Sequence, residues 1–264
     1  MNRRMFVSST LAASGLAGLS PLATLQAAEA AGAREYYEWR TVRLKDAAKQ
    51  KAFEDYLREA GIPGLRRAGL GPIGVFKPET GDGILHVLMT YRSIDQFLTA
   101  SDVMRRDQDY LKAAEAHINA PPTDPAYDRI DSSFMVAFEG MPRLEVPTAA
   151  SGNQARVFEL RIYESHSKKA NKKKIEMFNV GEIAIFRRTG LTPVFFGESL
   201  IGPRLPNLTY LLVFKDRADR DKNWGVFVKN PEWDKLKGTP GYADKEIVSK
   251  ITNTFLVPLA CSQV

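Results

Sequence analysis

The stretch FELRIYES, residues 158–165, decides the fold of this chain. Its residues alternate as in a β-strand, so that apolar side chains share one face and polar side chains share the other. The stretch YEWRTVRL, residues 37–44, places Glu38 and Arg40 in equivalent positions 121 residues earlier. A Glu-x-Arg step at the start of two similar segments indicates an internal repeat. The polar face of the later stretch carries Glu159, Arg161 and Tyr163.

The repeat extends over most of the chain. Two extra residues in the second copy change the offset to 123, where ILHVLMTYR (84–92) lies on NLTYLLVFK (207–215). The offset returns to 121 where IDSSFMV (130–136) lies on ITNTFLV (251–257). Because a chance match would not resume in order after two small changes of length, we infer a duplication.

Each copy predicts the order strand, helix, strand, strand, helix, strand, which is the ferredoxin-like βαββαβ unit. Gly69 and Gly190 stand where a left-handed residue ends the first helix. Pro63 predicts a bend or an early end of that helix in the first copy. The predicted strands are 35–44, 71–77, 84–92 and 132–138, then 156–165, 192–201, 207–215 and 253–259. The predicted helices are about 46–67 and 93–118, then 168–188 and 216–236.

A sheet of this unit has helices on one face only, so its other face needs a partner. The predicted fold class is therefore α+β, with two tandem βαββαβ repeats that form a pseudo-dimeric α/β barrel. We expect Phe158, Leu160 and Ile162 to pack on the helices, and the polar face to point between the copies with Glu38 and Arg40. Buried charges are costly unless paired. These groups therefore bind a ligand in a shared pocket, form ion pairs that set the register of the two halves, or lie in water.

The amino terminus has the pattern of an export signal. Arg3 and Arg4 precede a run of small and apolar residues, and Ala28-Glu29-Ala30 offers a cleavage site within 27–31. NRRMFV resembles a bacterial twin-arginine signal without the usual Ser or Thr before the pair, and a general secretory signal is the alternative. Gly, Ser and Pro interrupt the run, which would make it a poor membrane span. We expect a periplasmic or secreted protein with no stable membrane span after signal removal.

The predicted organisation has four parts: the signal peptide over 1–30, a first repeat over 31–138, a Pro-rich linker over 139–155 and a second repeat over 156–264. Composition is that of an ordinary soluble globular protein, with 44% hydrophobic and 26% charged residues. Much of the net charge of +6 lies in SKKANKKK, residues 167–174, which reads either as a solvated helix start or as an anion-binding surface. Basic residues are not interleaved with aromatic ones, so we expect no nucleic-acid partner.

The second copy resembles the NIPSNAP family. The resemblance rests on VFELRIYES, TGLTPVFFGESLIG and LPNLTYLLVFKDRADRDKNWGVFVKNPEW, and it covers nearly all of residues 155–245. The first copy is a weaker relative, with Ser101 in place of Trp224 and Tyr110 in place of Trp233. NIPSNAP domains belong to the dimeric α/β-barrel superfamily, so the resemblance implies one barrel but no particular reaction. The divergence of the first copy predicts one preferred pocket, built mainly on the second half.

The sequence offers little for metal or cofactor chemistry. Its three histidines have no metal-ligand spacing, and the single Cys261 excludes a multi-cysteine site, so we expect no metal. Some barrels of the superfamily bind haem, and His86 is the candidate axial ligand because a strand position can face the lumen. A structural histidine is the simpler interpretation, and no cofactor is predicted. A G-x-S-x-G motif and a P-loop are both missing from the sequence.

The candidate site is a set of charged and aromatic residues. Arg161 would hold an anionic or carbonyl oxygen. Glu159 would act as a general base if burial raises its pKa. Strand parity alone leaves open whether Tyr210 or Thr209 faces inward. The ligand-binding candidates are Glu38, Arg40, Tyr163, Tyr210 and Trp224, with core packing as the alternative role for Trp224.

Three functions of different classes follow from these residues. The first is a module that binds a small anionic or aromatic ligand in the barrel lumen. The second is a cofactor-free enzyme, such as a monooxygenase or isomerase, that uses the Glu, Arg and Tyr side chains. The third is a structural or interaction protein in which the charged pairs only align the two halves. The sequence does not decide whether the protein is an enzyme. Exposed sheet edges would also let the chain form a homodimer.

Overall fold

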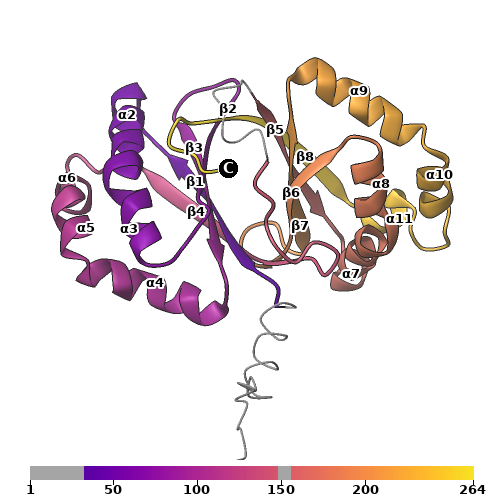
Figure 1. Cartoon of the computed structure of the whole chain (residues 1–264), viewed down its shortest axis with the longest axis horizontal. Helices are drawn as coiled ribbons and strands as arrows, with labels where there is room; N and C mark the ends of the chain where they lie inside the picture. Colours follow the sequence, from indigo (N-terminus) through magenta and orange to yellow (C-terminus); the bar gives the residue numbers. More distant parts are fainter. Residues whose placement is uncertain (1–32, 148–155) are drawn as a thin grey trace, which may run out of the picture. The chain divides into compact units, whose positions relative to one another are not determined.

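The computed structural model describes residues 33–147 and 156–264. The expected signal peptide with its cleavage site, and the part of the linker over 148–155, lie outside the described residues. The described part of the chain contains two βαββαβ units, one after the other, as the sequence predicts (Figure 1).

The first unit runs from β1 to β4. Its long first helix consists of α2, a π-helical turn and α3, and its second helical layer consists of α4, α5 and α6. The elements are β1 Tyr36–Arg43, α2 Ala47–Tyr56, the π-turn Leu57–Gly61, α3 Ile62–Arg67, β2 Gly74–Pro78, β3 Ile84–Tyr91, α4 Ile94–Arg106, α5 Gln108–Ala113, α6 Glu115–Ile118 and β4 Arg129–Ala137.

The second unit repeats this order from β5 to β8. Its elements are β5 Val157–Glu164, α7 Lys168–Met177, the π-turn Phe178–Glu182, α8 Ile183–Arg188, β6 Thr192–Ile201, β7 Asn207–Phe214, α9 Arg217–Val228, α10 Pro231–Lys237, α11 Asp244–Ile247 and β8 Lys250–Pro258. The two π-turns lie 121 residues apart, at equivalent places in the two units.

Helix ends follow the polar residues of the sequence. Asp46 and Ser167 cap α2 and α7, and each side chain accepts a hydrogen bond from the backbone N–H three residues later. Gly69 and Gly190 follow the helices with φ of 79° and 85°, as predicted. Pro63 was expected to bend or end the helix early. The helix instead continues to Arg67 through the π-turn, where an i→i+5 pattern replaces the usual spacing.

The eight strands form one closed antiparallel barrel in the order β1-β3-β2-β8-β5-β7-β6-β4. Each unit contributes four neighbouring strands, and the two sheets join where β2 pairs with β8 and where β4 pairs with β6. The helices of each unit cover the outer face of its own sheet (Figure 1). Every described strand has a neighbour on both sides. The prediction that exposed sheet edges could pair in a homodimer was therefore wrong. The homodimer itself stays a prediction.

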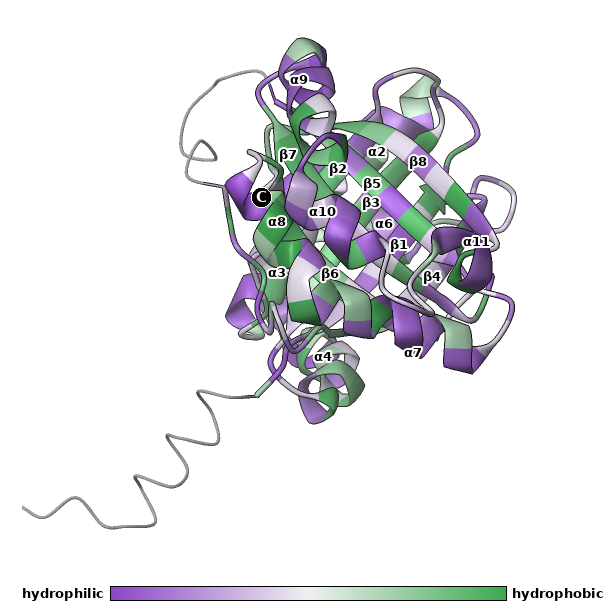
Figure 2. Cartoon of the chain, turned by 90° about the vertical axis from the view of Figure 1, so that its right-hand side faces the viewer, coloured by the Kyte–Doolittle hydropathy of each residue, from purple (hydrophilic) through white to green (hydrophobic). Residues whose placement is uncertain are grey.

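The barrel lumen is filled by apolar side chains from both units. Phe76 of β2 lies 4.9 Å from Phe158 of β5, and Tyr37 of β1 lies 5.0 Å from Phe195 of β6, as measured between ring centroids. Figure 2 shows the hydrophobic β7 behind helices such as α9 and α10 that carry many hydrophilic residues. The other members of this lumen core are Trp39, Leu88, Met135, Ala137, Leu160, Val194, Leu211, Val213, Leu256 and Val264.

The predicted facing of the central strand was wrong. Phe158 and Leu160 point into the lumen, whereas Tyr163 belongs to the core between β5 and the helices of the second unit. The lumen is enclosed by strands on all sides, so it takes the apolar face. The charged face lies under the helices, where polar side chains from a helix can pair with it.

Among the described residues, no helix is both long and apolar enough to cross a membrane.

Candidate functional site

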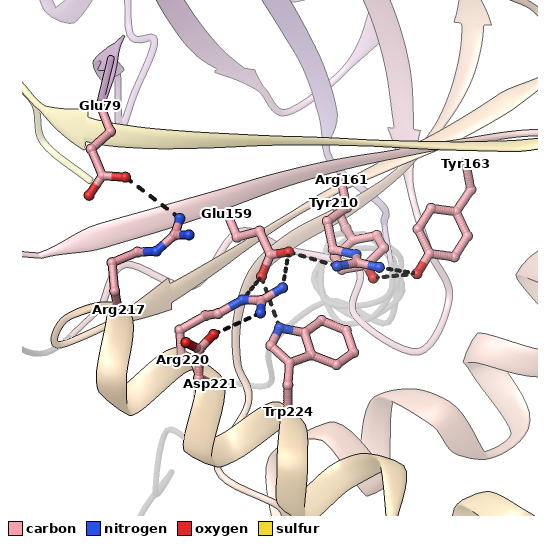
Figure 3. Close-up of polar contacts among 9 residues, drawn as sticks. All are labelled: Glu79, Glu159, Arg161, Tyr163, Tyr210, Arg217, Arg220, Asp221 and Trp224. Carbon is pink, nitrogen blue, oxygen red and sulfur yellow. Dashed lines mark hydrogen bonds and ion pairs between the residues drawn. The ribbon is translucent and has the colours of Figure 1, made fainter.

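The Glu-x-Arg step of β5 is completed by a helix. Glu159 is fully buried, and one of its oxygens, Oε1, accepts hydrogen bonds from Arg161 Nη1 at 2.6 Å and Arg220 Nη2 at 2.9 Å. Its Oε2 accepts from Arg220 Nε at 3.0 Å and from Trp224 Nε1 at 2.8 Å. Arg220 and Trp224 stand one helical turn apart on α9, so both reach down to the strand (Figure 3).

Aromatic side chains close around Arg161. Its guanidinium lies 4.5 Å from the ring centroid of Trp224, and Nη2 donates to the Tyr163 hydroxyl at 3.0 Å. Tyr210 donates to the same hydroxyl at 3.0 Å. Tyr210 therefore faces the helices, and by alternation Thr209 faces the lumen. The five residues predicted in the second copy do come together, but under α9 rather than in the lumen (Figure 3).

The carboxylate of this second-unit cluster is fully engaged, with two hydrogen bonds to each oxygen. Burial on its own would raise the pKa of Glu159, but hydrogen bonds from Arg220 and Trp224 and the charge of Arg161 outweigh it and hold the pKa below its usual value. The condition for Glu159 to act as a general base is therefore not met. Arg161 is also buried, with 10% of its side chain exposed and the ring of Trp224 against its guanidinium.

The first unit has the same step in an open setting. Glu38 accepts from Arg40 Nε at 2.7 Å and Nη2 at 3.1 Å, from Tyr91 at 2.9 Å and from Ser132 at 2.7 Å. The carboxylate is buried, whereas 41% of the Arg40 side chain is exposed. Glu38 and Arg40 lie under the helices of their own unit. The prediction that they share the barrel lumen with Glu159 and Arg161 was therefore wrong.

A cavity of about 420 Å3 lies against Arg40, between the first sheet and its helices. Aromatic and sulfur-containing side chains form much of its wall. The pocket predicted mainly on the second half is thus found on the first half. This wall includes Phe53, Tyr56, Tyr91, Phe97, Met104, Tyr110 and His117.

Smaller side chains make room for the cavity in the first unit. The offset of 121 before the indel, and of 123 after it, aligns the lining residues with residues of the second unit. At nine of these positions the first unit has the smaller side chain. The pairs are Val42 for Tyr163, Leu57 for Phe178, Gly61 for Glu182, Leu65 for Phe186, Val87 for Tyr210, Ala100 for Asn223, Ser101 for Trp224, Met104 for Phe227 and Tyr110 for Trp233.

Two titratable side chains meet in the cavity wall. The rings of Tyr56 and His117 stack with centroids 3.6 Å apart and planes 8° from parallel. Burial lowers the pKa of His117, which keeps the imidazole neutral near pH 7. Burial, together with a hydrogen bond shared with Tyr110, raises the pKa of Tyr56. The wall therefore offers neutral polar groups opposite the cationic Arg40.

His86 is the residue considered for haem. It lies between Leu85 and Val87 of the helix-side core, so alternation points it toward the lumen. Its Nδ1 accepts from Trp39 Nε1 at 3.2 Å, and the two ring centroids are 5.4 Å apart. Because the packed lumen core borders this ring, the surroundings of His86 do not fit a haem. No three His, Cys, Asp or Glu side chains gather as metal ligands in the described part of the chain.

The sequence interpretation missed several residues. Arg220 escaped notice because RADRDKNW looks like an ordinary solvated helix start, although it stands four residues before Trp224. Tyr91 and Ser132 were missed because each reaches Glu38 from a different strand. The usable signal was the exchange of Trp224 for Ser101, which marks a lost side chain under the helix of the first unit.

Comparison with known protein families distinguishes the second unit from the first. Residues 158–263 match the model of the NIPSNAP family. The match covers the second unit, and the first unit lies outside it. No curated protein matches the chain.

Solved structures share the barrel fold. A proposed monooxygenase from Fusobacterium nucleatum is 10% identical, with 86% of this chain and 93% of that chain covered and a TM-score of 0.55. A second proposed monooxygenase, from Lactobacillus acidophilus, is 10% identical, with 85% and 94% covered and a TM-score of 0.52. An uncharacterised NIPSNAP-like domain protein from Burkholderia xenovorans is 21% identical, with 41% of this chain and 89% of that chain covered and a TM-score of 0.37.

Proposed function

We propose that the protein binds a small molecule in the cavity of the first unit. The ligand has an aromatic or apolar body and one anionic or carbonyl oxygen. The observation that carries this proposal is the cavity of about 420 Å3 with a fixed arginine in its wall. That volume lies in the range of small-molecule sites, which are mostly apolar with a few well-placed polar groups.

Arg40 supplies the polar anchor. Its Nε and Nη2 donate to Glu38, and the hydrogen bonds from Tyr91 and Ser132 hold that carboxylate in place. The Nη1 edge stays available to a ligand oxygen. A guanidinium that is already fixed loses little conformational entropy on binding, which favours affinity.

The apolar wall supplies most of the contact area. Phe53, Phe97 and Tyr110 present ring faces or edges, and Met104 adapts to the shape of the guest. Planar aromatic acids and ketones fit this cavity, because their rings can pack on the apolar side chains while their oxygen binds Arg40.

The test compares 2-naphthoate with naphthalene by calorimetry and thermal shift. Ser101→Trp restores the bulk of the second unit and should abolish binding of both probes. Leu98→Trp is the matched control, because it adds the same indole to the same helix at a position that is 65% exposed. Arg40→Gln should weaken 2-naphthoate at least tenfold, since charged hydrogen bonds contribute about 1.5–3 kcal/mol, and should leave naphthalene unchanged. Binding that survives Ser101→Trp would contradict the proposal.

An enzyme is the second candidate, favoured by His117. This neutral imidazole lines the cavity and could take a proton from a ligand whose oxygen is held by Arg40. Glu38 is a poor base, because its oxygens already accept four hydrogen bonds. The monooxygenase names belong to structures that share only the fold. His117→Gln separates the candidates: a binding module keeps its affinity and shows no turnover in either form, whereas an enzyme loses turnover and keeps affinity.

Export completes the proposal. The twin-arginine-like pattern of residues 1–30 supports a periplasmic or secreted protein that takes its ligand outside the cytoplasm.

A further inference from the structure

The hairpin between β6 and β7 exposes a group of apolar side chains. Leu200, Ile201 and Leu205 are 43%, 68% and 47% exposed. Single exposed apolar residues are ordinary on protein surfaces. Three within six positions of one hairpin form a patch, and such patches mark sites of interaction.

The tip of this hairpin is held in a defined shape. Asn207 Nδ2 donates to the carbonyl oxygens of Pro203 and Arg204 at 3.0 and 3.1 Å. Ser199 donates to Asn207 Oδ1 at 2.6 Å. The apolar side chains are therefore presented on a braced turn.

Lysines of α7 stand beside the same hairpin. Lys168 and Lys172 line a groove of about 360 Å3 together with Leu200 and Leu205. Glu198 is the acidic residue of that groove, and Lys172 bonds its carboxylate at 2.7 Å. Lys168 and Arg204 give the patch a positive border, whereas Lys174 of the same basic run is buried and paired with Glu182 and Asp244.

We propose that this surface, defined as Leu200, Ile201, Arg204, Leu205, Lys168, Lys172 and the exposed Lys169 that follows Lys168 in the first turn of α7, docks onto a bilayer that contains anionic phospholipid. The aliphatic side chains enter the boundary between headgroups and acyl chains, and the cations contact lipid phosphates. Apolar burial and attraction to anionic lipid add together in such peripheral binding. Branched aliphatic ends and flexible lysines suit a fluid anionic surface, and charge complementarity selects that partner. The protein lies on the membrane without crossing it.

The experiment uses the full chain and vesicles of phosphatidylcholine, either pure or mixed with phosphatidylglycerol, which supplies the negative surface potential. Two double variants remove one component each: Ile201→Ser with Leu205→Ser, and Lys168→Glu with Lys169→Glu. The matched control is Leu98→Ser with Lys112→Glu, which changes an exposed leucine and an exposed lysine of the first unit. Residues 1–30 are common to all forms, so differences between variants report on the hairpin surface alone.

Each hairpin variant should lower the partition coefficient for phosphatidylglycerol vesicles about tenfold or more, because one variant removes apolar side chains that enter the bilayer and the other reverses two charges that face its anionic surface. The control should bind like the wild type, and salt should weaken binding. Equal binding by all forms, or binding that ignores the phosphatidylglycerol fraction, overturns the proposal. Sedimentation velocity tests whether the surface instead joins two copies of the chain. If Ile201→Ser with Leu205→Ser splits a dimer and leaves vesicle binding unchanged, the surface joins two copies of the chain and the membrane proposal is wrong.

Discussion

Glu38 and Glu159 are equivalent residues in unlike surroundings. Each accepts four hydrogen bonds, but Glu159 neutralises two arginines in a packed interior, whereas Glu38 neutralises one arginine beside a cavity. The same sequence step therefore lies in a packed interior in one unit and borders a cavity in the other.

Replacing these carboxylates should separate the two roles. Glu159→Gln leaves Arg161 and Arg220 without their anion, and we expect a loss of about 3–5 kcal/mol in the free energy of unfolding. Glu38→Gln should cost about 1–2 kcal/mol, because the partly exposed Arg40 can be solvated in the cavity. Urea denaturation of both variants checks the order. Equal losses would contradict the difference in packing.

His86 should make stability depend on pH. Burial, with a smaller effect from Arg43, lowers the pKa of His86 from 6.5 to about 4. Between pH 6.5 and 4 the imidazole is protonated in the unfolded chain but stays neutral in the folded chain. The contribution of neutral His86 to the free energy of unfolding is therefore complete above pH 6.5 and is lost as the pH falls toward 4. The slope is about 1.4 kcal/mol per pH unit. The difference in unfolding free energy between wild type and His86→Gln, measured from pH 7 to 4, should show this slope. A constant difference would show that His86 does not titrate in this window.

The sequence predicts which candidate residues come together, but it does not predict which face of the sheet they occupy. Glu159, Arg161 and Trp224 do meet, as their spacing predicts. Both faces of a barrel strand are buried, so alternation separates the faces without saying which one is shut off from water. A partner such as Arg220, on a helix 61 residues away, decides that question.

At the scale of elements, the order of strands and helices was predictable because caps and glycines mark their ends. The π-turns were not, since a single i→i+5 turn leaves no periodic signal. The closing segment after β8 was also unexpected. Gln263 exchanges hydrogen bonds with Ile73, Ser262 accepts from the Val75 N–H, and Val264 is buried in the lumen core.

Removing residues 262–264 should therefore destabilise both units. Two backbone N–H groups lose their partners and one valine leaves the core, which together predict a loss of about 3 kcal/mol. Guanidinium denaturation measures it. Cys261→Ser is the control, because it keeps all of these contacts. An unchanged midpoint after the deletion would mean that the segment contributes nothing to stability.

At the scale of the molecule, the two units share one lumen core. The fragment 156–264 alone would expose Phe158, Leu160 and Leu211 to water. We expect it to rebuild a barrel as a dimer, and to pair with fragment 34–147 when both are present. Light scattering after size-exclusion chromatography distinguishes these species. A folded, monomeric 156–264 would contradict the shared core.

Export is tested on the whole chain. Arg3→Lys with Arg4→Lys should block passage to the periplasm if the twin-arginine route is used, and should have little effect if the general secretory route is used. Fractionation with mass spectrometry of the mature amino terminus reads both outcomes. A cleaved, exported chain should begin within residues 27–31, and an intact cytoplasmic chain would contradict export.

Joining the two units in one chain has a consequence for how the cavity could arise. In an assembly of identical chains, a tryptophan at the position of Trp224 would fill both halves, and a serine there would hollow both. Here Trp224 and Ser101 are encoded separately, so one half can be hollow while the other stays solid. Mutations that enlarge the cavity can therefore accumulate in one unit without changing the side chains of the other.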